Sequence, residues 1–226
     1  MKNYQLIETA SEQEFVQKSV TFLKQKIEDS IVQRDHCIIG FSGGSTPRPI
    51  YQALEKEKMN WSKISGFLID ERYVPPDDPK SNQYLIRKTL PNISLTVPDS
   101  SLPIKTCIQK YVKDLKELWA KHLPDIIVLG MGTDGHIASL FPPLPPNLRD
   151  DSLLIAHTHT DTFDIPDRIT LTLNPILAAT SHILLLRGRD KKKTWDKMLK
   201  SSGGESSWPM KAVLEQSDVT VIRNIH

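Results

Sequence analysis

Asp134 and His136 stand two residues apart just beyond DIIVLG, a mostly apolar run that is typical of a buried strand. The segment that holds them, GMGTDGH, contains three glycines, which permit a tight turn of the backbone at the strand end. Imidazole takes and gives a proton near neutral pH, and a nearby carboxylate can orient it or bind sugar hydroxyls. The pattern predicts an acid/base site in which His136 reacts and Asp134 is its neighbour.

A single histidine can instead serve only to make a structural hydrogen bond, and this is the alternative role for His136. The glycines and the carboxylate at the same strand end favour the catalytic role. The segment AHTHT places His157 and His159 on either side of one threonine, but no third ligand stands at a recognisable metal-site spacing. We interpret these two histidines as polar residues of a strand end, and we expect neither a metal nor a cofactor.

The segment FSGGSTPRP ends another apolar run, HCIIGF, and has the features of an anion site. Gly43 and Gly44 let the chain turn tightly and bring its N–H groups close to a ligand. Ser45 or Thr46 can cap the helix that follows, where free N–H groups and the helix dipole attract negative charge. This segment matches neither the GxxxxGK[ST] pattern nor the GxGxxG pattern. A phosphate on a small metabolite is the predicted ligand, and an ordinary glycine turn before a helix is the alternative.

Asp70, Glu71 and Arg72 stand together at the end of a third apolar run, SGFLID. Charges at the end of a buried strand cost free energy unless they are paired or solvated. Arg72 can present a planar fork to a phosphate or a carboxylate. Ser81 and Asn82 then begin a predicted helix, with Ser81 as its N-cap. A plain surface turn is the alternative, but the glycine loop elsewhere in the chain favours a binding site.

The elements that must position these strand ends alternate along the chain. Apolar periodicity separates helices from short strands, and the residues ASLF after His136 are expected to begin a further helix. This alternation is typical of an α/β fold, a Rossmann-like and mostly parallel sheet with helices on both faces in an α/β/α arrangement. Ligands bind such sheets beyond the carboxyl ends of the strands, so we expect the three segments to meet there. The predicted helices are 11–32, 47–58, 81–90, 109–121, 176–179 and 190–200, and the predicted strands are 36–41, 65–70, 125–130, 153–156, 169–173, 182–187 and 219–223.

The composition is that of an ordinary globular protein. The chain of 226 residues carries a net charge of +2, so its charge implies no strong attraction to nucleic acid or to a membrane surface. It has no run approaching the roughly 18 apolar residues of a membrane helix, and no apolar signal core near its start. Cys37 and Cys107 lack zinc-site spacing and fit a reducing compartment. We expect one domain over residues 1–226, in the cytoplasm, as a monomer or a weak homodimer.

Five segments occur in an order that resembles the 6-phosphogluconolactonase family: SGGSTP, IDERYVP followed by SN, GMGTDGHIASLFP, PDRITLTL and GRDKKK. Glucosamine-6-phosphate deaminases of the wider superfamily typically carry NGHIAFNEP and DEY, where this chain has TDGHIASLFP and DER. In these two segments the chain therefore resembles the lactonases rather than the deaminases. It departs from their pattern at Ile137, where threonine is usual, at the segment PPLPPN, and at Arg189 and Asp190, which stand in a segment that is commonly small.

The resemblance implies a Rossmann-like α/β fold and hydrolysis of 6-phospho-D-glucono-1,5-lactone in the oxidative pentose phosphate pathway, without a cofactor. It implies that His136 is the acid/base residue with Asp134 beside it, and that cations from three segments surround the phosphate of the sugar. The substrate-binding residues that it implies are Gly43, Gly44, Ser45, Thr46, Asp70, Arg72, Asn82, Arg168 and Lys191.

Two other functions remain open. The first is an isomerase or deaminase acting on an amino-sugar phosphate, in which Asp70 would take the proton from C2. The second is a regulator that binds a sugar phosphate without catalysis. Release of ammonia from glucosamine 6-phosphate distinguishes the first, and ligand binding without lactone hydrolysis distinguishes the second.

Overall fold

The computed structural model describes residues 4–149 and 152–224, whose strands form two sheets. The larger sheet has seven strands, all parallel, in the order β1-β10-β9-β6-β2-β3-β5. Because helices cover both faces of such a sheet, its central strands are apolar throughout, and every residue of β2 is buried. The strands are β1 (Gln5–Thr9), β2 (Cys37–Phe41), β3 (Ile64–Leu68), β5 (Ser94–Thr96), β6 (Ile126–Gly130), β9 (Ser181–Arg187) and β10 (Val219–Asn224).

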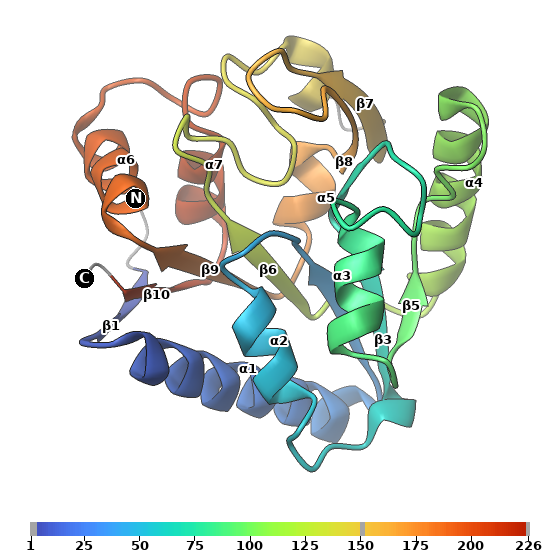
Figure 1. Ribbon diagram of the computed structural model, residues 1–226, viewed down its shortest axis with the longest axis vertical. Helices are drawn as coiled ribbons and strands as arrows, with labels where there is room; N and C mark the ends of the chain where they lie inside the picture. Colours follow the sequence, from blue (N-terminus) through green and yellow to red (C-terminus); the bar gives the residue numbers. More distant parts are fainter. Residues whose placement is uncertain (1–3, 150–151, 225–226) are drawn as a thin grey trace.

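One face of the large sheet is covered by α1 (Glu12–Arg34), α2 (Arg48–Leu54) and α3 (Asn82–Thr89). Helix α1 begins as the sequence predicts, because the Ser11 side chain accepts a hydrogen bond from the Glu14 N–H. Apolar side chains of the three helices pack in one cluster with those of β2 and β9. Figure 1 shows α1 running below the strands, with α2 and α3 in front of them.

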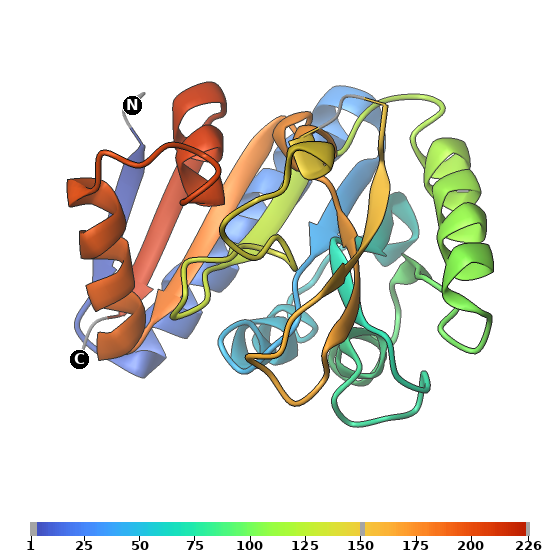
Figure 2. The same cartoon turned by 90° about the horizontal axis from the view of Figure 1, so that it is seen from above.

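The opposite face carries α4 (Ile104–Leu118), α5 (Leu173–Leu177), α6 (Arg189–Lys200) and α7 (Pro209–Gln216). Tyr111 of α4 and Trp195 of α6 are both fully buried in a second apolar cluster on this face. Figure 2 shows α6 and α4 at opposite ends of the sheet, with the other elements of this layer between them. The predicted α/β/α arrangement around a parallel sheet is therefore confirmed.

A second, antiparallel sheet lies in this layer, formed by β4 (Asp70–Arg72), β8 (Asp167–Leu171) and β7 (Ile155–His159) in the order β4-β8-β7. Strand β4 follows β3 after one residue, Ile69, so the predicted single strand 65–70 is divided between the two sheets. The antiparallel register places Arg72 directly opposite Arg168. This pairing brings together two cations that are far apart in the sequence.

Several elements differ from those predicted. Strands β1 and β5 and helix α7 have no counterpart in the sequence prediction, and two short 3₁₀ helices, η1 (Trp61–Lys63) and η2 (Pro146–Arg149), are also new. The predicted helix at ASLF is wrong. Ala138 has a positive φ of 49°, and Ile137 forms isolated bridges with Met131 and Leu140, so the chain folds into a tight loop instead. Among the described residues, no helix is long and apolar enough to cross a membrane.

Candidate active site

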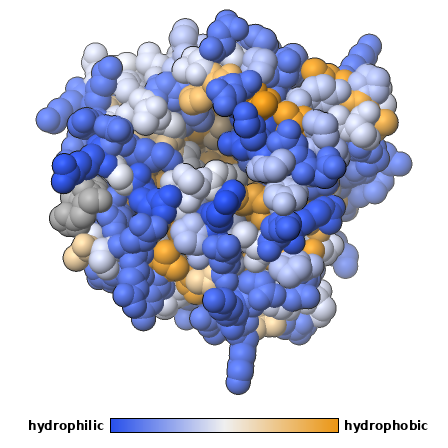
Figure 3. All heavy atoms as spheres, in the orientation of Figure 1, coloured by the Kyte–Doolittle hydropathy of each residue, from blue (hydrophilic) through white to orange (hydrophobic). Residues whose placement is uncertain are grey.

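The carboxyl ends of β2 and β6 and the neighbouring β4 surround a cleft of about 340 Å³. Figure 3 shows that the surface is hollowed above the middle of this face, with both hydrophilic and hydrophobic side chains around the hollow. Asp134 and Thr46 do not line the cleft themselves. Each is hydrogen-bonded to a residue that does, Asp134 to His136 and Thr46 to Lys191. The other residues that the sequence assigns to a ligand site all line the cleft: Gly43, Gly44, Ser45, Asp70, Arg72, Asn82, His136, Arg168 and Lys191.

The imidazole of His136 is oriented by Asp134, whose Oδ1 lies 2.5 Å from Nδ1. Because a carboxylate only accepts, the proton of the neutral ring sits on Nδ1, and Nε2 is left as the proton acceptor. Partial burial raises the pKa of Asp134, but its hydrogen bond with His136 and the charge of that residue lower the pKa, and the net direction is downward. Asp134 is therefore ionised at neutral pH and fixes the orientation of the His136 ring through Nδ1.

Gly132 is required by the close approach of this pair. A Cβ at position 132 would lie 2.3 Å from the His136 ring and 2.5 Å from Asp134 Oδ1. The backbone supports the same turn, since the Gly132 N–H donates to the His136 carbonyl at 2.9 Å. Gly132 of the GMGTDGH segment thus makes room for the pair that the sequence singled out.

The glycine loop after β2 packs against Asn82, which is only 1% exposed. Asn82 Nδ2 donates to the Asp70 carbonyl at 2.9 Å, while its Oδ1 is buried without a hydrogen-bond partner among the described residues. A Cβ at Gly43 would lie 1.8 Å from this Oδ1. The loop and the start of α3 therefore fit together only because position 43 has no side chain.

We expect Gly43→Ala to lower the free energy of unfolding by about 1–3 kcal/mol, since the added methyl group must displace the buried amide of Asn82. Gly204→Ala is the matched control, because a Cβ at Gly204 meets no atom within 4 Å. Urea denaturation of the two variants measures the difference. Equal stabilities would show that Asn82 moves aside without cost.

Glu71 explains how charges are tolerated at the end of β4. Its carboxylate is only 1% exposed, yet it accepts hydrogen bonds from the N–H groups of Arg72, Asn82 and Gln83 and from the Ser81 hydroxyl. Two of these N–H groups belong to the first turn of α3, where the helix dipole favours a negative charge. Glu71 is therefore a structural anchor for α3, which leaves the neighbouring Asp70 and Arg72 to line the cleft.

Three cations line the cleft without a carboxylate partner. Among the described residues, neither Arg72 nor Arg168 nor Lys191 forms a salt bridge, although Arg168 is only 7% exposed. Burial lowers the pKa of Arg168, and the charge of Arg72, its partner across the sheet, lowers it further. Buried like charges are unfavourable unless an anion joins them. The arrangement is suited to a phosphate or a carboxylate.

Comparison with known proteins assigns the chain to a family. The model of the family described as glucosamine-6-phosphate isomerases/6-phosphogluconolactonase matches residues 10–222. The chain belongs to this family. A protein of Dictyostelium discoideum named "Probable 6-phosphogluconolactonase" is 39% identical over 223 residues, which cover 94% of each chain. The 6-phosphogluconolactonase of Thermotoga maritima is 33% identical over 83% of this chain and 86% of its own.

Solved structures of the family have the same fold. The 6-phosphogluconolactonase from Plasmodium vivax superposes with a TM-score of 0.91 and 28% identity, covering 100% of this chain and 92% of its own. The Thermotoga maritima enzyme gives a TM-score of 0.83 at 28% identity, covering 97% of this chain and 100% of its own. The resemblance noted in the sequence is confirmed.

Ser139 is a residue of the site that the sequence analysis did not single out, although it lies in the segment IASLFP. It is 1% exposed, and its hydroxyl donates to Asp70 Oδ2 at 2.7 Å. Its N–H donates to the Thr170 hydroxyl at 3.2 Å, and its carbonyl accepts from the Thr158 hydroxyl at 2.9 Å. Ser139 thus ties the loop that carries His136 to all three strands of the small sheet.

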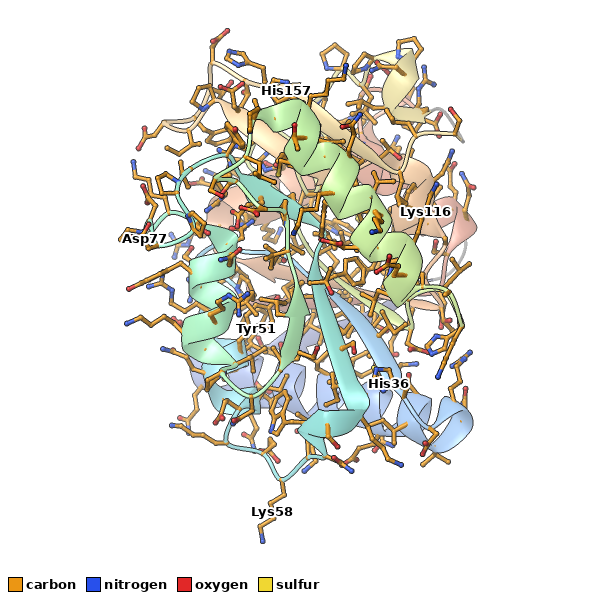
Figure 4. The ribbon with its side chains drawn as sticks, turned by 90° about the vertical axis from the view of Figure 1, so that its right-hand side faces the viewer. His36, Tyr51, Lys58, Asp77, Lys116 and His157 are labelled. Carbon is orange, nitrogen blue, oxygen red and sulfur yellow. The ribbon has the colours of Figure 1, made fainter. Side chains whose placement is uncertain are left out.

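Three other histidines, His36, His157 and His159, have structural surroundings. His157 and His159 both contact the Asp167 carboxylate, at 2.7 and 3.1 Å, and no cluster of metal-ligand residues is found among the described residues. His36 stands just before β2, where its Nε2 lies 2.9 Å from the Ser65 hydroxyl. Figure 4 shows His157 and His36 toward opposite ends of the molecule. These contacts fit the interpretation of His157 and His159 as polar residues of a strand end.

Proposed function

We propose that this protein hydrolyses 6-phospho-D-glucono-1,5-lactone to 6-phospho-D-gluconate, a step of the oxidative pentose phosphate pathway, in the cytoplasm. One observation carries the proposal: an imidazole oriented by a carboxylate and three cations without a salt bridge among the described residues line the same cleft of about 340 Å³. The family of the chain and the names of its relatives support the same activity. Two buried, unpaired cysteines support a reducing compartment.

His136 acts first as a general base in the proposed reaction. Its Nε2 takes a proton from water as the water oxygen bonds to C1 of the lactone, and the carbonyl electrons move onto the carbonyl oxygen. When this tetrahedral intermediate collapses, the bond from C1 to the ring oxygen breaks, and His136 returns the proton to that oxygen. The product is an open-chain acid with a free hydroxyl group. Positioned acid/base groups of this kind contribute about 10²–10⁴-fold to a rate.

The cations position the substrate for this step. Arg72, Arg168 and Lys191 bind the phosphate, with the N–H groups of the glycine loop beside them, and Asp70 and Asn82 contact the sugar hydroxyls. Holding the reacting atoms in place can lower the barrier by as much as about 7–11 kcal/mol. Because a δ-lactone carbonyl is already electrophilic, positioning and proton transfer suffice for catalysis.

The affinity for 6-phosphogluconate is expected to depend on pH through Lys191. Burial, and secondly the charge of Arg187, lower the pKa of Lys191. The phosphate is attracted by the charged ammonium, so affinity is full at neutral pH and falls as the pH rises through this lowered pKa, below the ordinary lysine value of about 10.4. Calorimetric titration between about pH 7 and about pH 10 measures the effect. Lys191→Arg keeps its charge over this range and should show no such loss. Parallel losses in both proteins would exclude Lys191 as the cause.

The activity itself is tested by following lactone consumption with the purified protein and subtracting the uncatalysed ring opening. A rate well above the spontaneous one supports the proposal. Two further measurements on the same sample address the alternatives. Ammonia release from glucosamine 6-phosphate would indicate a deaminase, and thermal stabilisation by 6-phosphogluconate without any hydrolysis would indicate a binding protein.

A further inference from the structure

Phe163 contacts two functional groups of the cleft, the imidazole of His136 and the guanidinium of Arg168. Its ring lies edge to face with the imidazole of His136, with ring centroids 5.4 Å apart. The central carbon of the Arg168 guanidinium lies 6.0 Å from the centroid of the same Phe163 ring. Phe163 stands in the loop between β7 and β8 and is only partly exposed, although the two residues before it are exposed. An aromatic ring held inward between exposed polar neighbours in its loop points to a specific role.

The first contact limits how the imidazole can move. Asp134 holds His136 at one ring atom, Nδ1, about which the ring can still tilt. Phe141 packs against the imidazole with centroids 4.8 Å apart, and the two phenylalanine rings lie 5.9 Å from each other. The three rings thus form a closed group. Phe141 belongs to the same loop as His136, whereas Phe163 reaches it from the small sheet.

The second contact ties Phe163 to the guanidinium that we assign to the phosphate. Arg168 Nε donates to the Ile165 carbonyl at 2.9 Å, so one edge of the guanidinium holds the loop that carries Phe163. Two further attachments are the ion pairs Lys80–Asp164 and His159–Asp161, each 3.2 Å long and exposed, and such pairs contribute little. The Thr160 N–H also donates to the Pro166 carbonyl at 3.1 Å, at the base of the loop. Arg168 thus supports the loop beneath Phe163 from its buried side.

We propose that Phe163 is a positioning residue, which makes the orientation of His136 depend on phosphate binding at Arg168. The inference rests on the proposed function, because that function assigns Arg168 to the phosphate and His136 to the lactone carbon. With the Nε edge bound to the loop, the Nη atoms of Arg168 remain for an anion. Before binding, the like charge of Arg72 across the sheet acts on this guanidinium. A bound phosphate removes that repulsion, fixes the guanidinium against Phe163, and so holds the ring against the imidazole.

The test compares two lactones in the full-length protein: 6-phosphogluconolactone and glucono-1,5-lactone, which lacks the phosphate. The quantity measured is the ratio of their kcat values, which is independent of the fraction of protein that is correctly folded. Phe163→Leu is expected to lower this ratio roughly threefold to tenfold, the range for losing one aromatic contact. Phe163→Tyr keeps the ring and should keep the wild-type ratio. Phe141→Leu is the matched control, because it removes a ring beside His136 within its own loop and should slow both lactones by the same factor.

A wild-type ratio in Phe163→Leu, or the same change in Phe141→Leu as in Phe163→Leu, would overturn the inference. Loss of the ratio in Phe163→Tyr would also contradict it, since the ring is retained. These outcomes leave the proposed function intact as long as the wild-type protein hydrolyses 6-phosphogluconolactone. If the wild-type protein does not accelerate that reaction, the proposed function fails, and the inference fails with it.

Discussion

His136→Ala lowers kcat for 6-phosphogluconolactone by about 10²–10⁴-fold, the contribution expected of a positioned acid/base group. The variant keeps the cations of the cleft, so its affinity for 6-phosphogluconate should stay close to that of the wild type. Stopped-flow or NMR measurement of lactone consumption, corrected for spontaneous opening, gives kcat, and calorimetry gives the affinity. A large loss of turnover with little loss of binding is the signature of a group that acts in the transition state.

His122→Ala is the matched control for this experiment. His122 precedes β6 and His136 follows it, so the two imidazoles stand at opposite ends of the same strand. Within the described part of the chain, the polar partners of His122 are the Leu123 carbonyl at 2.9 Å and the Asp125 carboxylate at 3.7 Å. Its removal should leave kcat unchanged. Turnover in His136→Ala that matches this control would remove His136 from the mechanism.

Arg168→Ala is expected to lower kcat/KM for 6-phosphogluconolactone by about 10²-fold, which corresponds to about 2.7 kcal/mol and lies within the range for hydrogen bonds to charged groups. The effect should be much smaller for glucono-1,5-lactone, which has no phosphate for the guanidinium to bind. Steady-state kinetics with the two substrates measure the difference. The result would assign the phosphate to the pair of arginines that the small sheet places opposite one another.

Arg87→Ala removes the same charge from the exposed surface of α3 and controls for the change in net charge. It should not alter the kinetics with either lactone. Equal losses of kcat/KM for both lactones in Arg168→Ala would argue against phosphate binding, because they would show that Arg168 only supports the shape of the cleft.

The layers of the fold could be predicted because periodicity and strand ends are local properties of the chain. The capping pattern of Ser11 and Glu14 and the apolar run of β2 depend only on residues near each other. The small sheet could not be predicted, because its strand β4 pairs with β8 nearly a hundred positions later. Nothing local marks Ile69 as the point where the chain leaves one sheet and enters the other. The helix predicted at ASLF was wrong for a similar reason: Ala138 has a positive φ, and the next residue, Ser139, is hydrogen-bonded to Asp70 and Thr170, which are distant in the sequence.

The candidate site was more predictable than the fold that surrounds it. Glycine, carboxylate and imidazole at a strand end are rare enough to be noticed, so Asp134 and His136 stood out without any structure. Residues that act through packing carry no such signal. In the sequence, Glu71 is one of three adjacent charges, and only the structure shows the four donors that hydrogen-bond to it. Similarly, only the structure shows that the ring of Phe163, a loop residue, packs against His136.

The central claim is that cations and imidazole act on the two ends of one substrate molecule. A crystal structure of the protein with bound 6-phosphogluconate tests this claim most directly. The account predicts the phosphate between Arg72, Arg168 and Lys191, and the C1 carboxylate within hydrogen-bond reach, about 3 Å, of His136 Nε2. A reversed ligand, with its phosphate beside His136, or a phosphate bound outside the cleft would contradict it.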